Sequence, residues 1–289
     1  MQSNDDTVYL GPRDETFNTF IKGLLERGNL KTKYIDLLTD QESMEIYGKA
    51  FTASSANPQD NYEVFEQLGD VTANKFIVWY MYRRFPQLYC TQGVKVVARL
   101  RINYGAKQSF SEIGERLGFW PFISATVEDR SRKKKPLLED ALEAFVGATE
   151  YLLDTKIRIG VGYAIVYDIL SNIFDEIPIS LQYENLYDAK TRLKELFDFF
   201  GDRLGVLKYV ETKRDVPGSQ VPTVSSVYRV IGGYGKQKAE GGQSHFLAEG
   251  VAALKGDAQQ RAASQALALL NAQGYVKEIP LEYSFFCRD

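Results

Sequence analysis

Cysteine and histidine are scarce in this chain of 289 residues, which has two cysteines, Cys90 and Cys287, and one histidine, His245. Two distant thiols are too few for a disulfide framework or a cysteine-based metal site, and they favour a reducing compartment. A single imidazole excludes catalysis by a histidine pair within one chain. No apolar run approaches the roughly 18 residues of a membrane span, and the first residues are polar and acidic, unlike a secretion signal. We therefore expect a cytoplasmic protein without membrane contact.

An excess of positive charge is also missing, since the net charge is −3. A hydrophobic content of 44% with 13% aromatic residues is typical of a folded chain, and the length indicates about two domains. The charge is unevenly distributed. Residues 186–275 carry 12 Lys and Arg against 9 Asp and Glu, whereas the rest of the chain carries 23 against 29. The acidic residues therefore lie mainly outside the second part of the chain.

Residues 61–70 form an acidic stretch with helical spacing. At 100° per residue, three acids fall within about 60° of one another: Glu63, Glu66 and Asp70. Four apolar residues take the opposite side: Val64, Phe65, Leu68 and Val71. The pattern continues to Pro86, which ends it. We expect a long helix in the core, with one acidic face that is either solvated or occupied by a cation.

A second pair of acids, Asp140 and Glu143, stands one helical turn apart within the otherwise apolar stretch 137–148. Like charges at this spacing repel each other, and hard divalent cations take carboxylate oxygens as ligands. If the two helices pack side by side, Glu66, Asp70, Asp140 and Glu143 converge. Such a basin of four carboxylates suits metal-assisted attack on a phosphodiester.

Residues 61–70 resemble the signature of the ribonuclease III family, Glu-x-x-Glu-x-Leu-Gly-Asp, and residues 140–143 resemble its second acidic element, Asp-x-x-Glu. Residues 50–54 and 110–123 are similar to the family's segments before each element. The resemblance covers about residues 14–160. The similar segments occur in the same order as in the family, and this shared order makes the resemblance specific.

The resemblance implies an all-α endonuclease domain over residues 1–183. It further implies Mg²⁺ (or Mn²⁺) held by the four carboxylates, with Glu63 in an accessory place that orients RNA or water. The expected activity is cleavage of double-stranded RNA by a homodimer, which leaves 5′-phosphate and 3′-hydroxyl ends and needs no small-molecule cofactor. One departure is Gln92, at a position where the family often has Glu.

The rest of this part of the chain is expected to be helical. Helices are predicted over 15–25 and 34–38, and another over 157–174. Residues 93–102 are rich in β-branched side chains and leave strand and helix open, but the family resemblance favours a helix. Residues 176–184, with Pro178, are expected to form a linker.

The segment 186–275 predicts the order α-β-β-β-α: a helix over 188–196, strands over 206–211, 225–231 and 245–251, and a helix over 257–273. This order resembles a double-stranded-RNA-binding domain, a small α+β fold that reads A-form RNA by shape. The RNA-contacting residues that it implies are Lys190, Thr191, Glu195 and Lys255. Of the lysine pair that the family has here, only Lys255 is present, and residues 217–224 lack the family's histidine. A role of this domain in dimerisation or docking is therefore an alternative to RNA binding. Residues 276–289 are expected to form a C-terminal tail, apolar over 279–286, that either packs against the body of the protein or contacts a partner.

A basic run precedes the second acidic pair: Arg130, Arg132, Lys133, Lys134 and Lys135. It is either a solvated loop or a phosphate clamp beside the metal site. Two other functions remain open for the whole chain: a non-catalytic scaffold with the ribonuclease III fold, and a module that sequesters double-stranded RNA. The presence of all five acids favours the enzyme over the scaffold.

Overall fold

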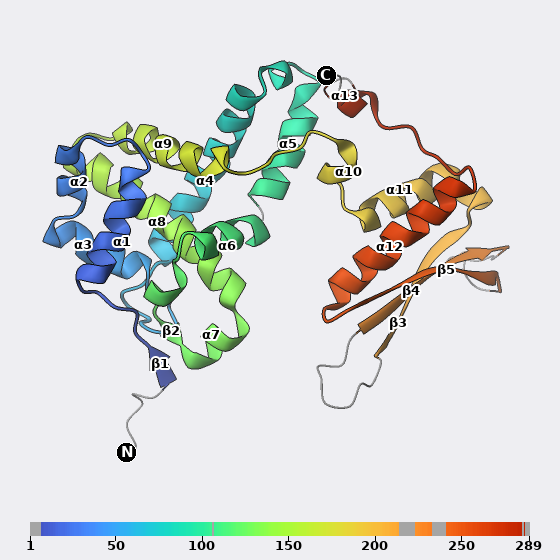
Figure 1. The fold of residues 1–289 in the computed structure, drawn as a ribbon, viewed down its shortest axis with the longest axis horizontal. Helices are drawn as coiled ribbons and strands as arrows, with labels where there is room; N and C mark the ends of the chain where they lie inside the picture. The colour runs from blue at the N-terminus through green and yellow to red at the C-terminus, as the bar shows by residue number, and fades with distance from the viewer. Residues whose placement is uncertain (1–6, 106, 214–222, 233–240, 285, 287–289) are drawn as a thin grey trace. The chain divides into compact units, whose positions relative to one another are not determined.

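The computed structural model describes residues 7–105, 107–213, 223–232, 241–284 and 286, and it divides into two compact units (Figure 1). The first unit is Met1–Ile179 and the second is Ser180–Asp289. Among the described helices, none combines the length and the apolar character needed to cross a lipid bilayer.

The first unit is helical. Its helices are α1 (Glu15–Glu26), α2 (Thr32–Leu38), α3 (Gln41–Ala50), α4 (Glu63–Arg84), α5 (Gly93–Tyr104), α6 (Lys107–Arg116), α7 (Val127–Arg132), α8 (Lys134–Lys156) and α9 (Val161–Asp175). Short 3₁₀ turns cover Pro86–Leu88 and Trp120–Phe122. Two short strands, β1 (Val8–Tyr9) and β2 (Ala125–Thr126), pair antiparallel.

Local sequence explains where several of these helices begin. The carboxylates of Asp14 and Asp40 accept hydrogen bonds from the first-turn amides of α1 and α3, and the Thr126 hydroxyl does the same for α7. Helix α4 ends at Arg84, just before Pro86, as the sequence predicts. The segment 93–102 lies within α5, which confirms the helical prediction there.

Helix α8 runs through the centre of the first unit, and most of its residues between Leu137 and Leu153 are buried. Helices α4 and α6 pack along it, and α3 and α9 also contact it. An aromatic cluster from other elements, which includes Phe17, Phe51 and Phe119, joins Phe145 of α8. The core therefore fixes α4 and α8 side by side.

The prediction that the apolar side of α4 lies in the core is wrong for three of its four residues. Phe65 is buried, but Val64, Leu68 and Val71 are exposed, Val71 by 66%. The buried side of α4 is formed instead by small and aromatic residues such as Ala73, Phe76 and Ile77, which pack toward α8 and α9. An apolar stripe is thus left on the surface of the described unit.

The second unit contains α10 (Tyr183–Leu186), α11 (Ala189–Phe200), β3 (Val206–Lys213), β4 (Thr223–Ile231), β5 (Gln243–Ala252), α12 (Lys255–Ala272) and α13 (Leu281–Ser284), with a 3₁₀ turn at Gly201–Arg203. The strands form an antiparallel sheet in the order β3-β4-β5, and α11 and α12 cover one face of it (Figure 1). The described order from α11 to α12 is α-β-β-β-α.

Leucines and alanines of α11 and α12 close the core of the second unit against the sheet, around Val227 and Leu247. The C-terminal segment joins this unit. Tyr283 of α13 is buried and packs edge-on against the rings of Tyr183 and Tyr187, and the hydroxyls of Tyr187 and Tyr283 lie 2.7 Å apart. The described part of the tail therefore packs, through Tyr283, on the start of its own unit.

Candidate metal centre and active site

Two glycines allow the backbones of α4 and α8 to touch. A Cβ atom at Gly69 would lie 1.8 Å from the carbonyl oxygen of Glu143, and one at Gly147 would lie 2.0 Å from the carbonyl oxygen of Phe65. Any other residue at either position would force the helices apart. The glycine within the Leu-Gly-Asp element thus brings the acids of α4 against those of α8.

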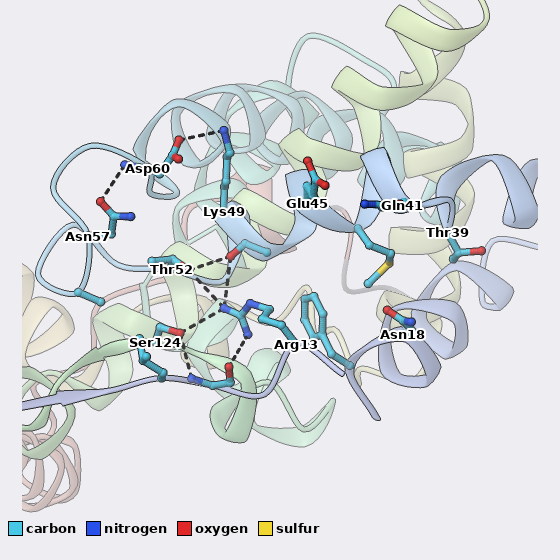
Figure 2. Close-up of a pocket in the computed structure, with 16 residues that line it drawn as sticks. Arg13, Asn18, Thr39, Gln41, Glu45, Lys49, Thr52, Asn57, Asp60 and Ser124 are labelled. Atoms are coloured by element: carbon cyan, nitrogen blue, oxygen red, sulfur yellow. Dashed lines mark hydrogen bonds and ion pairs between the residues drawn. The ribbon is translucent and has the colours of Figure 1, made fainter. Parts of the chain in front are cut away.

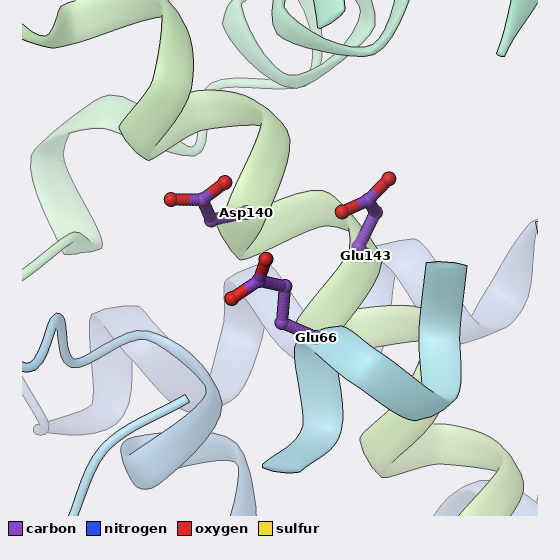
Figure 3. A group of neighbouring side chains, drawn as sticks. All are labelled: Glu66, Asp140 and Glu143. Carbon is purple, nitrogen blue, oxygen red and sulfur yellow. The ribbon is translucent and has the colours of Figure 1, made fainter. Parts of the chain in front are cut away.

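Three carboxylates meet where these helices touch (Figure 3). Glu66 projects from α4, Asp140 and Glu143 project from α8, and one oxygen of each lies within 4.8 Å of the others. Oxygens that share one Mg²⁺ at about 2.1 Å stand about 3–4 Å apart. The group is therefore nearly preformed for a hard divalent cation.

Glu143 shows the electrostatic effect of this arrangement. The pKa of its carboxyl is raised to about 8, first by burial and then by the neighbouring charges of Glu139, Asp70, Glu66 and Asp140, in that order. In the described part of the chain, no Lys or Arg lies within 4.0 Å of Glu143. A bound cation would offset this accumulation of negative charge, so the donor set fits Mg²⁺ or Mn²⁺.

Tyr62, at the N-terminus of α4, holds Asp140 in place. Its buried hydroxyl donates a hydrogen bond of 2.8 Å to Oδ2 of Asp140. Burial and the charge of Asp140 raise the pKa of this phenol above its ordinary value, so it remains a donor. Sequence reasoning missed both Tyr62 and the buried Glu139, because neither role is visible until the two helices are packed.

The other two predicted acids lie at the edge of the group. Asp70 is exposed, and Nδ2 of Asn74 donates a hydrogen bond of 2.8 Å to its Oδ1. Its charge acts on Glu143, but none of its oxygens belongs to the group of three. Glu63 is exposed in the first turn of α4 and also lies outside the group. The structure therefore brings together Glu66, Asp140 and Glu143.

The predicted basic run is largely engaged with its own surroundings. Arg130 donates to the carbonyl oxygens of Ile123 and Trp120, at 2.5 and 3.2 Å, and its guanidinium lies 3.9 Å from the ring centres of Tyr9 and Trp120. It therefore braces the segment before α7. The following residues form ion pairs: Arg132 with Glu128, Lys133 with Asp129, and Lys134 with Glu115. Among the described residues of this run, Arg130 and Lys135 have no such ion pair, and Arg130 is held by the carbonyl and ring contacts above.

The predicted RNA-contacting residues of the second unit also bind one another. Gln259 accepts a hydrogen bond of 2.5 Å from Nζ of Lys190 and donates one of 2.6 Å to Glu211. Glu211 in turn pairs with Lys255 at 2.8 Å.

Thr191 and Glu195 on α11 are engaged too. The hydroxyl of Thr191 donates to Asp188, the N-cap of the helix. Glu195 accepts from Lys277 at 2.8 Å and from the Tyr183 hydroxyl. Residues 217–222 of the expected loop lie outside the described residues.

A separate hollow of about 1080 Å³ lies beside α1 and α3 (Figure 2). Arg13, which lines this hollow, donates to the carbonyl oxygens of Phe122 and Phe51, at 2.8 and 3.0 Å, and to the hydroxyls of Thr52 and Ser124. Burial lowers the pKa of this guanidinium to about 10. Because its donors are already taken, Arg13 ties the N-terminal segment to the body of the unit.

Residues 63–152, which hold both acidic helices, match the Ribonuclease III domain model. The chain is 42% identical, over 96% of its own length and 96% of the other, to a putative ribonuclease 3 of Invertebrate iridescent virus 6. The chain belongs to the ribonuclease III family. A putative ribonuclease 3 of Frog virus 3 is 41% identical over 89% of this chain and 63% of that protein. Membership confirms the predicted family and makes this chain a ribonuclease III-type endoribonuclease, a phosphodiester hydrolase.

Among solved structures, the nuclease domain of ribonuclease III from Campylobacter jejuni is similar to this member of the ribonuclease III family. It is 25% identical, covers 50% of this chain and 95% of its own, and has a TM-score of 0.40.

Proposed function

We propose that this ribonuclease III family member cleaves double-stranded RNA in a reaction that depends on a divalent metal ion, and that it leaves 5′-phosphate and 3′-hydroxyl ends. The observation that supports this most is the meeting of Glu66, Asp140 and Glu143 across α4 and α8. When bound, Mg²⁺ or Mn²⁺ would supply Lewis-acid activation of a water and stabilisation of the leaving 3′ oxygen.

The side chains of this site then have distinct roles. The carboxylates of Glu66, Asp140 and Glu143 hold the ion, and the Tyr62 hydroxyl orients Asp140. Asp70 completes the ligand set from the rim, where its charge already acts on Glu143. Glu63, exposed one turn before Glu66, orients RNA or a water.

A homodimer is the second part of the proposal. The exposed stripe of Val64, Leu68 and Val71 on α4 lies beside Tyr151 and Ile159, and Ile159 is 86% exposed. Leu68, Val71, Tyr151 and Ile159 line a hollow of about 830 Å³. A contiguous apolar surface of this kind is typical of a protein interface. A second copy that covers it would place two acidic groups in one assembly, one for each strand of a duplex.

We propose a subordinate role in RNA binding for the second unit. Its α-β-β-β-α order supports a double-stranded-RNA-binding-like domain over residues 186–275, followed by a tail over 276–289 in which Tyr283 packs on Tyr183. The ion pair of Lys255 with Glu211 lowers the net charge of the expected phosphate-binding surface. Because phosphate contacts supply most of the sequence-independent affinity, this unit should hold RNA weakly and the nuclease unit should contribute the rest.

Cleavage of a long duplex tests the proposal. Purified protein is incubated with perfectly paired RNA and Mg²⁺, beside Glu143→Gln and beside Glu45→Gln, an exposed acid on α3 that serves as the matched control. Wild type and Glu45→Gln should yield short duplexes whose ends carry 5′-phosphates. Glu143→Gln should lose more than about a hundredfold in rate, since removal of even an outer partner of a metal ligand costs 10–100-fold. Binding without cleavage by the wild type would favour the non-catalytic scaffold.

A further inference from the structure

A further hollow in the nuclease unit, of about 400 Å³, lies between the C-terminal half of α4 and α9. It is lined by Trp79, Arg83, Tyr163, Ala164, Tyr167 and Asp168. Trp79 is 50% exposed, although an indole of this size is normally buried once a chain has folded. The hollow therefore presents a large aromatic face to whatever enters it.

Cations lie directly against the aromatic rings of this hollow. Nζ of Lys75 is 3.8 Å from the ring centre of Tyr163, and the guanidinium carbon of Arg83 is 5.3 Å from that of Tyr167. The two tyrosine rings are 6.2 Å apart. In the described part of the chain, neither Lys75 nor Arg83 is paired with a carboxylate within 4.0 Å. The exposed indole of Trp79, two half-buried tyrosine rings and positive charge thus coincide at one place.

This hollow is separate from the acidic group. Trp79 follows Asp70 by nine residues, about 14 Å along the helix axis, and at 100° per residue it points about 140° away from Glu66. The inference therefore goes beyond the cleavage of duplexes and does not require the metal centre to function.

The combination of groups selects one class of ligand. Aromatic side chains stack on unpaired bases of any identity, and neighbouring Arg or Lys side chains meet the phosphates. Bases within a duplex are already stacked on one another and are not available. We propose that Trp79, Tyr167 and Arg83 form a binding site for an unpaired nucleotide of RNA, with its base against the indole and its phosphate near Arg83 and Lys75.

A second copy of this chain is the competing occupant, because the apolar stripe of α4 points to the same side of the helix as Trp79. Covering this end of α4 with an apolar partner would bury Lys75 and Arg83 without counter-charges, which is costly. A nucleotide supplies both the flat apolar surface and the negative charge. The chemistry of the hollow therefore favours RNA over self-association at this end.

The intrinsic fluorescence of Trp79 provides the test, because the chain has only two tryptophans, Trp79 and Trp120. The full-length Trp120→Phe variant leaves Trp79 as the single reporter. It is titrated in EDTA, which prevents metal-dependent cleavage, with a short single-stranded RNA, a blunt duplex of equal length, and an abasic strand that keeps the phosphates. The single strand should quench Trp79 at concentrations at which the other two do not.

Binding of a labelled single strand to the Trp79→Ala and Arg83→Gln variants is measured by fluorescence anisotropy. The affinity of the tryptophan variant should fall about tenfold or more, in line with the loss of one base stack. Tyr89→Ala removes another exposed aromatic of the same unit and should leave the affinity unchanged. Thermal melting verifies that each variant is folded.

Equal quenching by the abasic strand, or no quenching by any RNA, would overturn the proposal. A change of Trp79 fluorescence with protein concentration alone would assign this surface to self-association and would also overturn it.

Discussion

At the scale of the residue, Glu143 shows how the packing of two helices changes the chemistry of one side chain. Its carboxyl is buried and surrounded by other acids, and its pKa is raised from 4.5 to about 8. A metal ion and a proton therefore compete for the same oxygens. Metal affinity should increase with pH up to about 8.

The stability of the metal-free protein should follow the opposite trend. Between pH 4.5 and 8 the folded state keeps a proton on Glu143 that the unfolded state has released, so raising the pH favours unfolding. Each pKa unit is worth about 1.4 kcal/mol, which corresponds to several degrees of Tm. Melting in EDTA between pH 5 and 8 should show a steeper decline for the wild type than for Glu143→Gln. Parallel melting curves for the wild type and Glu143→Gln would contradict the raised pKa of Glu143.

Tyr62 acts through Asp140 and not on the substrate. Tyr62→Phe removes only the hydroxyl that orients the Asp140 carboxylate. We expect a loss of about 10–100-fold in Mg²⁺ affinity, as is usual for partners of metal ligands, with maximal cleavage partly restored at high Mg²⁺. Tyr80→Phe is the matched control. It removes a buried hydroxyl near the other end of α4, which donates a hydrogen bond to Asp175 of α9. Equal losses in both variants would indicate general destabilisation instead.

At the scale of the element, the contact between α4 and α8 depends on Gly69. In Gly69→Ala the new methyl would overlap the carbonyl oxygen of Glu143. We expect a destabilisation of about 1–3 kcal/mol, typical of overpacking, together with loss of metal binding.

Gly23→Ala is the control for this variant, because Gly23 lies on the exposed side of α1 with no atom within 4 Å of an added Cβ. It should stabilise by about 0.5–1 kcal/mol. Unfolding in urea measures both variants. A Gly69→Ala protein as stable as the wild type would mean that the helices are not held as described.

The elements themselves were largely predictable, since periodicity and helix ends are local properties. The helix at 93–102 and the strands and helices after residue 186 are where the sequence predicts them. The helix α3 was missed, because its polar residues gave no clear apolar pattern. The burial of Val64, Leu68 and Val71 was predicted wrongly, because periodicity indicates an apolar side but not whether the same chain covers it.

The candidate site was predictable in its acids but not in its supports. Glu66, Asp140 and Glu143 stand in two recognisable motifs, and the structure groups them. Tyr62 stands immediately before Glu63, the first acid of the first motif, yet its partner Asp140 is 78 residues away in the sequence. Such a contact exists only in three dimensions.

At the scale of the whole molecule, the exposed stripe on α4 predicts the oligomeric state. Leu68→Asp combined with Val71→Asp places charges in the proposed interface and should convert a dimer into a monomer, measured by sedimentation equilibrium. Val94→Asp, an exposed valine on α5, is the control and should remain dimeric. A wild-type protein that sediments as a monomer at micromolar concentration would contradict the dimer.

Metal-dependent cleavage by this protein requires that acids from two helices distant in the sequence share one cation. Titration of the RNA-free protein with Mn²⁺, followed by calorimetry or by the electron paramagnetic resonance of the free ion, tests this directly. Glu66→Gln, Asp140→Asn and Glu143→Gln should each weaken binding by about tenfold or more, whereas Glu45→Gln should bind as the wild type does. Unchanged Mn²⁺ affinity in all three site variants would contradict the account.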